Sequence, residues 1–178
     1  MSEYQPYDPA VEVSGAAILS TIAGLQDDVL SVLAAHGIGR ITADGWYPQQ
    51  AWLDALRDIS TGGGILDLVS VGMRVPDTAL WPPEVDTVEK ALLSIDVAYQ
   101  MNHRNGEIGS YHAEVIEEGH VRLMCDNPNP SDFDYGIIYQ TTRKFMPRGQ
   151  VFTVRRADSP SRKNGDDMCI YDVTWGDV

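Results

Sequence analysis

Residues 108–126 read IGSYHAEVIEEGHVRLMCD, and they decide the fold class because their apolar side chains recur at every second position. Such alternation is typical of a half-buried β-strand. Glu118-Gly119 interrupts the alternation and supplies the residues of a tight turn. The stretch therefore predicts an antiparallel hairpin of two strands, 108–117 and 120–126.

The sequence after this hairpin predicts a helix and then a second hairpin. Residues 131–145 have apolar side chains at helical spacing, with Ser131 or Asp132 as the expected N-cap. Alternation returns in residues 150–156 and 168–175, which a long polar loop separates. We therefore expect a ββαββ unit over residues 107–176, which forms an antiparallel sheet.

The sequence before the hairpin predicts helices. Residues 1–13 lack periodicity and are expected to form an extended arm. Residues 14–104 form the helical part, with Gly62-Gly63-Gly64 as a hinge or tight turn. Four helices are expected within it, at 16–36, from Pro48 to the glycine triplet, at 65–74, and from Asp86 or Thr87 to Asn102. The predicted fold is α+β in one domain, 1–178, with an N-terminal helical layer followed by the ββαββ unit.

The charge of the chain excludes several classes of protein. There are 26 acidic and 13 basic side chains, which gives a net charge of −13 and disfavours binding to nucleic acid. No apolar run is long enough for a membrane span, and residues 1–4 do not begin a signal peptide. We therefore expect a cytoplasmic protein without nucleic-acid or membrane partners. The basic residues gather in 143–163, which is either a solvated face or a docking surface for an acidic partner or anionic ligand.

A longer pattern in residues 107–176 points to a family. Its marks are Gly136 in a helix, Phe145-x-Pro147 at the helix end, and then Ser161-Arg162-Lys163-x-Gly165-Asp166-x-x-Cys169-x-Tyr171-x-Val173-x-Trp175. This pattern resembles the 4-vinyl reductase-type ligand-binding domain, whose fold is related to haem nitric-oxide sensors and to a transport-particle subunit family. The resemblance implies a sensor of small, often hydrophobic or aromatic compounds that acts on transcription or signalling modules.

The same resemblance implies no cofactor for this chain. Some relatives bind zinc through cysteines and an acidic residue, but Ser161 stands where a cysteine is expected, and only Cys169 and, roughly, Asp158 match. The haem sensors hold the propionates with a Tyr-x-Ser-x-Arg triplet, which is absent, and no axial histidine is obvious. We therefore expect neither haem nor zinc.

The candidate site is a cavity between the helices and the sheet. His103 and Arg104 lie where the last helix meets the first strand and could hold an anionic group, although they could equally cap that helix. Apolar pockets with a few polar groups are the usual form of a ligand site, whereas the same residues could also be plain core. The predicted ligand-binding residues are His103, Arg104, Tyr99, Tyr111, Phe133, Ile137 and Trp81. No catalytic or metal-ligating residue is assigned.

Three functions remain open from the sequence. The first is a stand-alone sensory domain for a small, largely apolar molecule, which signals to a regulatory protein and forms a homodimer. The second is a small biosynthetic enzyme that uses His103, Arg104, Tyr111 or His112 as acid–base groups. The third is a structural adaptor that dimerises through Ile18, Ile22 and Leu25. The absence of nucleophile and phosphate-loop motifs favours a role other than catalysis.

Overall fold

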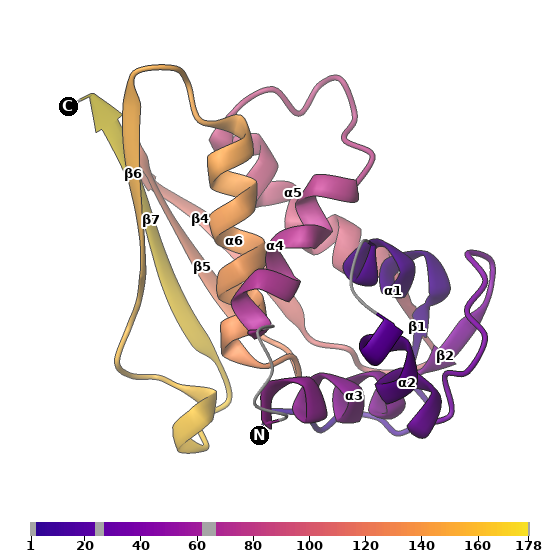
Figure 1. Cartoon of the computed structure of the whole chain (residues 1–178). Coiled ribbons are helices and arrows are strands. Elements are labelled where there is room, and N and C mark those ends of the chain that lie inside the picture. The colour runs from indigo at the N-terminus through magenta and orange to yellow at the C-terminus, as the bar shows by residue number, and fades with distance from the viewer. Residues whose placement is uncertain (1–2, 24–26, 62–66, 178) are drawn as a thin grey trace.

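The computed structural model describes residues 3–23, 27–61 and 67–177, and it has the expected α+β fold class. Four antiparallel strands form the larger sheet in the order β4-β5-β7-β6. Figure 1 shows this sheet on one side of the molecule, with α6 and α5 against one of its faces and α4 packed on α6. The bounds are β4 Ser110–Glu117, β5 His120–Asp126, β6 Gln150–Arg156, β7 Cys169–Asp177, α4 Leu68–Thr78, α5 Val88–Met101 and α6 Ser131–Phe145.

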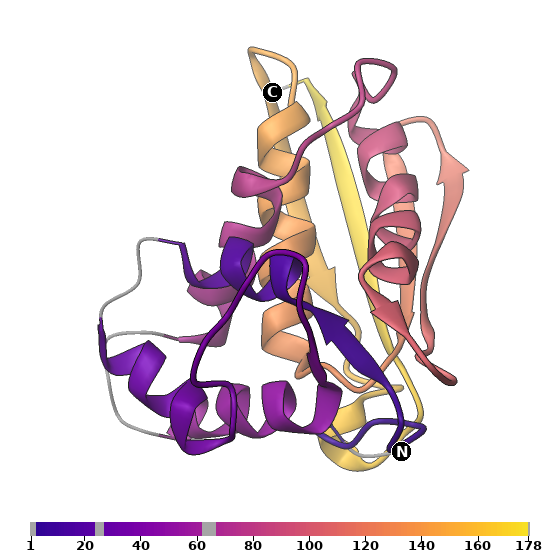
Figure 2. The same ribbon diagram turned by 90° about the vertical axis from the view of Figure 1, so that its right-hand side faces the viewer.

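The N-terminal part adds three helices and a small sheet. The sequence predicted helices here but not the sheet. Strand β1 pairs with β2 on one side and with β3 on the other, so the expected extended arm ends in a three-stranded sheet. Figure 2 shows this part below α4 and α5. The bounds are β1 Glu12–Ser14, β2 Trp46–Pro48, β3 His103–Arg104, α1 Gly15–Ile22, α2 Asp27–Ala35 and α3 Gln49–Thr61.

The two faces of the larger sheet differ in polarity, as the alternation in the sequence requires. On β5, Val121, Leu123 and Cys125 are fully buried, whereas the residues between them are half-buried. The open face carries polar pairs instead, including Arg122 with Asp172. The predicted hairpins are therefore confirmed, and β5 pairs with β7 to join them into one sheet.

Helix boundaries differ from the expectation in two places. The single helix expected over residues 16–36 is two helices, α1 and α2, and the glycine triplet lies outside the described residues. Helix α4 begins at Leu68, because the Asp67 side chain accepts a hydrogen bond from the Ser70 backbone at 2.7 Å. It also continues through Pro76, which was expected to follow its end.

The start of α6 is capped from a distant part of the chain. Ser131 or Asp132 was expected to cap it, but the N-cap residue is Pro130, which has no side-chain cap. The Glu3 carboxylate instead accepts a hydrogen bond from the Ser131 backbone nitrogen at 2.8 Å. The N-terminal arm therefore supplies the anionic cap that the helix dipole favours.

No helix in the described part of the chain is long and apolar enough to cross a membrane.

Helices α4 and α6 approach so closely that each needs a glycine at the contact. A Cβ atom on Gly136 would lie 2.2 Å from the Val69 carbonyl oxygen, and one on Gly72 would lie 2.2 Å from the Phe133 oxygen. Both obstacles are backbone atoms, which do not move without shifting a whole helix. These glycines therefore set the distance between two walls of the candidate site.

We expect Gly136→Ala to lower the melting temperature by roughly 4–8 °C, which corresponds to an overpacking cost of about 2 kcal/mol. Alanine would raise helix propensity, so a loss of stability identifies the close contact as its cause. Gly39→Ala is the control, because nothing lies within 4 Å of a Cβ atom at that exposed position. Equal melting temperatures for the two variants would contradict the close approach.

A candidate ligand-binding cavity

The structure contains a largely apolar cavity of about 120 Å³ between the helices and the sheet. Its walls come from β1, α1, α3, α4, α5, β4 and α6, with Trp81 from the segment between α4 and α5. Ligand sites in proteins usually measure ~300–1,000 Å³. An apolar cavity of ~150 Å³ nevertheless holds benzene or xenon. In its present form the cavity therefore suits a ligand about the size of one aromatic ring.

Most of the residues predicted to bind a ligand lie on the wall of this cavity. The lining includes His103, Tyr99, Tyr111, Phe133, Ile137 and Trp81, and their role in binding stays a prediction. Arg104 is not among the lining residues. Its guanidinium instead contacts the Glu12 carboxylate at 2.6 Å and lies 4.3 Å from the centre of the Trp46 ring. It thus ties β3 to β1 and β2 within the small sheet.

His103 is held in one tautomer. Its Nδ1 lies 2.8 Å from the Tyr99 carbonyl oxygen, which only accepts hydrogen bonds, so Nδ1 carries the proton. Burial lowers the pKa of His103, and the ring is therefore neutral near pH 7. Its Nε2 keeps a free lone pair, since no donor contacts it among the described residues. A carbonyl bonded to one ring nitrogen is the usual support of a metal-binding imidazole.

Two tyrosines close the sheet side of the cavity without a free proton to donate. The Tyr99 hydroxyl donates to the Ile108 carbonyl oxygen at 2.6 Å, and the Tyr111 hydroxyl donates to Asp134. Their rings meet edge to face with centres 5.1 Å apart. Burial raises the pKa of both phenols above the ordinary value. Both therefore remain neutral, and Tyr111 is not the ready acid–base group that the enzyme alternative supposed.

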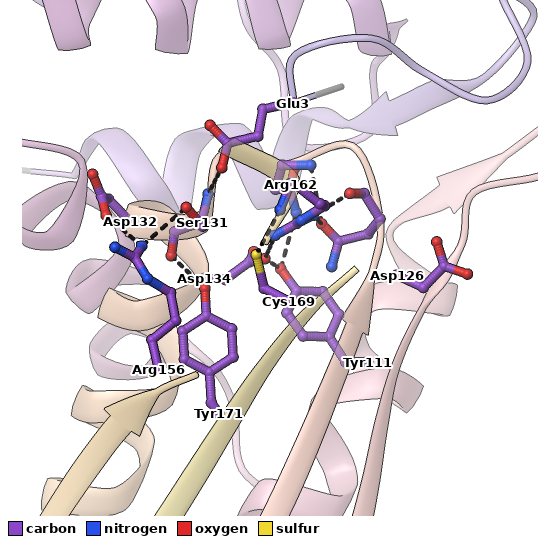
Figure 3. Close-up of polar contacts among 12 residues, drawn as sticks. Glu3, Tyr111, Asp126, Ser131, Asp132, Asp134, Arg156, Arg162, Cys169 and Tyr171 are labelled. Carbon is purple, nitrogen blue, oxygen red and sulfur yellow. Dashed lines mark hydrogen bonds and ion pairs between the residues drawn. The ribbon is translucent and has the colours of Figure 1, made fainter. Parts of the chain in front are cut away.

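A buried ion pair lies directly behind Tyr111. Arg162, which begins the 3-10 turn Arg162–Asn164 in the β6–β7 loop, bonds to the Asp134 carboxylate, and both side chains are almost completely buried. Arg162 also bonds to the Asn127 side-chain oxygen at 2.7 Å and to the carbonyl oxygen of the same residue. Figure 3 shows these groups converging with Tyr111 and Cys169. The pair anchors the long loop to the start of α6.

The charge state of this pair follows from its surroundings. Burial raises the pKa of Asp134, while Arg162 and the Tyr111 hydroxyl oppose that rise. Burial would lower the pKa of Arg162, but Asp134 raises it above the ordinary value. A neutral Asp134 would leave a buried cation unpaired, which is far more costly than the ion pair. We therefore treat both groups as ionised.

Sequence reasoning missed the members of this cluster. Asp134 was not singled out as a site residue and Arg162 was interpreted only as one of a basic group, because nothing in their local sequence distinguishes a buried charge from an exposed one. Two other members of that group, Arg156 and Lys163, bind Asp132 at 2.8 Å each. Three of the seven basic residues in 143–163 therefore bind the N-terminal turn of α6.

The cysteines and the other titratable groups form no metal site. Cys125 and Cys169 are free, fully buried and directly opposite each other on β5 and β7. Within the described ranges, no cluster of three His, Cys, Asp or Glu side chains could hold a metal ion.

Ile18 and Ile22 are buried in the core of their own chain, and Leu25 lies outside the described residues. Two of the three residues offered for the dimer surface of the adaptor are therefore core residues, and the homodimer itself stays a prediction.

The fold matches solved H-NOX structures. One, an H-NOX protein from S. oneidensis in the Fe(II)NO state, has a TM-score of 0.67 at 11% identity and covers 92% of this chain and 99% of its own. An H-NOX mutant from K. algicida gives 0.68 at 11%, with 92% and 97% covered. An oxygen-binding H-NOX domain related to soluble guanylate cyclases gives 0.66 at 15%, with 92% and 93% covered.

The expected relationship to haem nitric-oxide sensors is thus confirmed for the fold. No sequence model of a protein family matches the chain, and no curated protein matches it. The 4-vinyl reductase label consequently has no support from any comparison.

The expectation that haem is excluded is corrected by these neighbours. They include a structure in an Fe(II)NO state and one described by haem redox potential and porphyrin distortion. Here, the free Nε2 of His103 is chemically suited to an iron atom. The cavity of about 120 Å³ is smaller than a porphyrin site requires, and its described lining contains no Arg or Lys to pair with propionates. His103 is therefore suited to bind the iron of haem, whereas the macrocycle requires a wider cavity.

We expect Asp134→Asn to destabilise the protein by about 3–5 kcal/mol in urea unfolding, because it leaves the Arg162 charge buried without a counter-ion. Asp172→Asn is the control, since its part-exposed contacts with Arg122 and His120 should contribute much less than a completely buried pair. A loss for Asp134→Asn no larger than that of the control would show that the ion pair is not essential.

Proposed function

We propose that this chain is a sensor domain in which a small, largely apolar ligand occupies the cavity and changes the contacts available to a signalling partner. The observation that carries the proposal is the cavity of about 120 Å³ with mainly apolar walls. Concave, mainly apolar sites with a few polar groups are the usual form of a small-molecule site. The likeness to sensor domains in the H-NOX fold supports the same conclusion.

The signal would leave the cavity through its polar end. Tyr111 and Asn129 line the cavity, and Tyr111 donates to Asp134, which binds Arg162 in the β6–β7 loop. A ligand that prefers one arrangement of Tyr111 shifts the population of loop positions by the difference of its two affinities. The partner would then recognise the surface that includes this loop.

The proposal predicts that toluene binds in the cavity and that Ala17→Phe abolishes this binding, because the new ring fills the space. Ala17 lines the cavity. Ligand-observed NMR with the purified full chain measures the effect. Ala16→Phe is the matched control on the same helix, since Ala16 is exposed and should leave toluene binding intact. Binding that survives Ala17→Phe would place the ligand elsewhere.

Haem is the cofactor that the fold neighbours indicate for such a sensor. When bound, it would supply an iron atom that takes up a diatomic gas. His103 would hold the iron through Nε2, while the Tyr99 carbonyl oxygen keeps the ring in the required tautomer. The helical layer would have to move away from the sheet to admit the macrocycle, because a cavity of about 120 Å³ is too small for it.

The haem form of the proposal predicts a Soret band when haemin is added to the purified chain, and its loss in His103→Ala. Added imidazole should restore the band in that variant. His112→Ala should behave as the unaltered protein, since His112 is exposed on β4. A band unchanged in His103→Ala would place the iron on another residue, and no band at all would restrict the site to small free ligands.

A further inference from the structure

The end of the cavity near the sheet contains a hydrogen-bond acceptor whose direction is fixed by the buried ion pair. Asn129 lines the cavity and is only 4% exposed. Its Nδ2 donates to the Tyr111 hydroxyl oxygen at 2.9 Å, and its backbone nitrogen donates to Asn127. Its Oδ1 accepts no hydrogen bond from any described residue. Because no described residue donates to it, this oxygen is available to accept a hydrogen bond from a ligand in the cavity.

The orientation of the Asn129 amide follows from its neighbours. Arg162 keeps Asp134 ionised, and an ionised carboxylate only accepts hydrogen bonds, so the Tyr111 proton must point toward Asp134. The Tyr111 oxygen then accepts its next hydrogen bond, and only the NH₂ group of Asn129 can donate one. The chain from Arg162 through Asp134 and Tyr111 therefore leaves Oδ1 as the free atom of the amide.

A second polar group on the wall also lacks a partner. Thr141 lines the cavity, is completely buried, and its Oγ1 has no hydrogen bond among the described residues. The hydroxyl of the next residue, Thr142, shows the usual alternative, because it donates to the Ile138 carbonyl oxygen at 2.8 Å. Together with the free Nε2 of His103, these two polar atoms on a mainly apolar wall indicate a ligand that is not purely hydrocarbon.

We propose that the ligand carries a hydrogen-bond donor, such as an aromatic hydroxyl or N–H group, which Asn129 Oδ1 accepts. The inference rests on the proposed function and names the ligand class for the same cavity. The apolar walls accommodate the ring, and the amide oxygen selects ring compounds with a donor over equally large ones without it. A ligand with only an acceptor at this position would meet Oδ1 with like polarity and bind poorly.

The test compares phenol with toluene, which have nearly the same size but differ in the donor. Isothermal titration of the full chain gives the ratio of their dissociation constants. We expect Asn129→Leu to reduce the preference for phenol over toluene about tenfold, because the phenol hydroxyl then enters an apolar wall without an acceptor. Thr142→Val is the control, since this buried hydroxyl already has a partner and does not line the cavity.

A second variant tests the orienting chain and keeps Asn129 in place. Tyr111→Phe removes the atom that holds Nδ2, so the amide can turn and offer a donor to the cavity. We expect this variant to gain affinity for benzonitrile, an acceptor, relative to phenol. Circular dichroism confirms that each variant is folded before titration.

The outcomes separate this inference from the proposed function. If toluene and phenol both bind and neither Asn129→Leu nor Tyr111→Phe changes the relative affinities, Asn129 is not the recognition group, and the inference alone is overturned. If neither compound binds to the unaltered chain and haemin gives no Soret band, the proposed function fails and takes this inference with it.

Discussion

The ion pair between Asp134 and Arg162 is the constraint on which the candidate site depends. It joins the first turn of α6 to the loop between β6 and β7, and both partners are almost completely removed from water. A buried pair of this kind adds little stability compared with an apolar substitute, but separating its two partners costs a large free energy. Any arrangement that separates the two groups leaves a charge unpaired, so the loop, the helix and the neighbouring polar groups can only move together.

This constraint explains why one end of the cavity is polar. The Tyr111 hydroxyl donates a hydrogen bond to Asp134, Asn129 donates one to Tyr111, and Asn127 accepts one from Arg162. A network of directed hydrogen bonds therefore lies behind the sheet end of the cavity wall. Further contacts fix the same corner from outside, because Glu3 caps α6 and Tyr171 donates to the Ser131 carbonyl oxygen at 2.7 Å. The other walls include apolar side chains of α4, α5 and α6, whose packing does not depend on directed hydrogen bonds.

Periodicity predicted the parts of this structure that depend on local pattern. The alternation around Tyr111 predicted the first hairpin, and that in residues 150–156 and 168–175 predicted the second. The helical spacing before Asn102 predicted α5, with Thr87 as one of its two candidate caps. The small sheet was missed because β1, β2 and β3 have only two or three residues each, too few for a period to show. Asp134 and Arg162 were missed for a different reason: 28 positions separate them, and only the folded chain shows that each removes the other from water.

The same distinction governs what a shared fold says about a ligand. Neighbours at 11–16% identity share the layered arrangement, which places a cavity between helices and sheet in this chain as well. The size of the cavity depends on a different set of contacts, because Gly72 and Gly136 let α4 and α6 approach until backbone meets backbone. A neutral His103 and a directed Asn129 then set its chemistry. Ligand selectivity therefore depends on a few side chains and on the distance between α4 and α6. Both can change while the order and arrangement of the helices and strands stay the same.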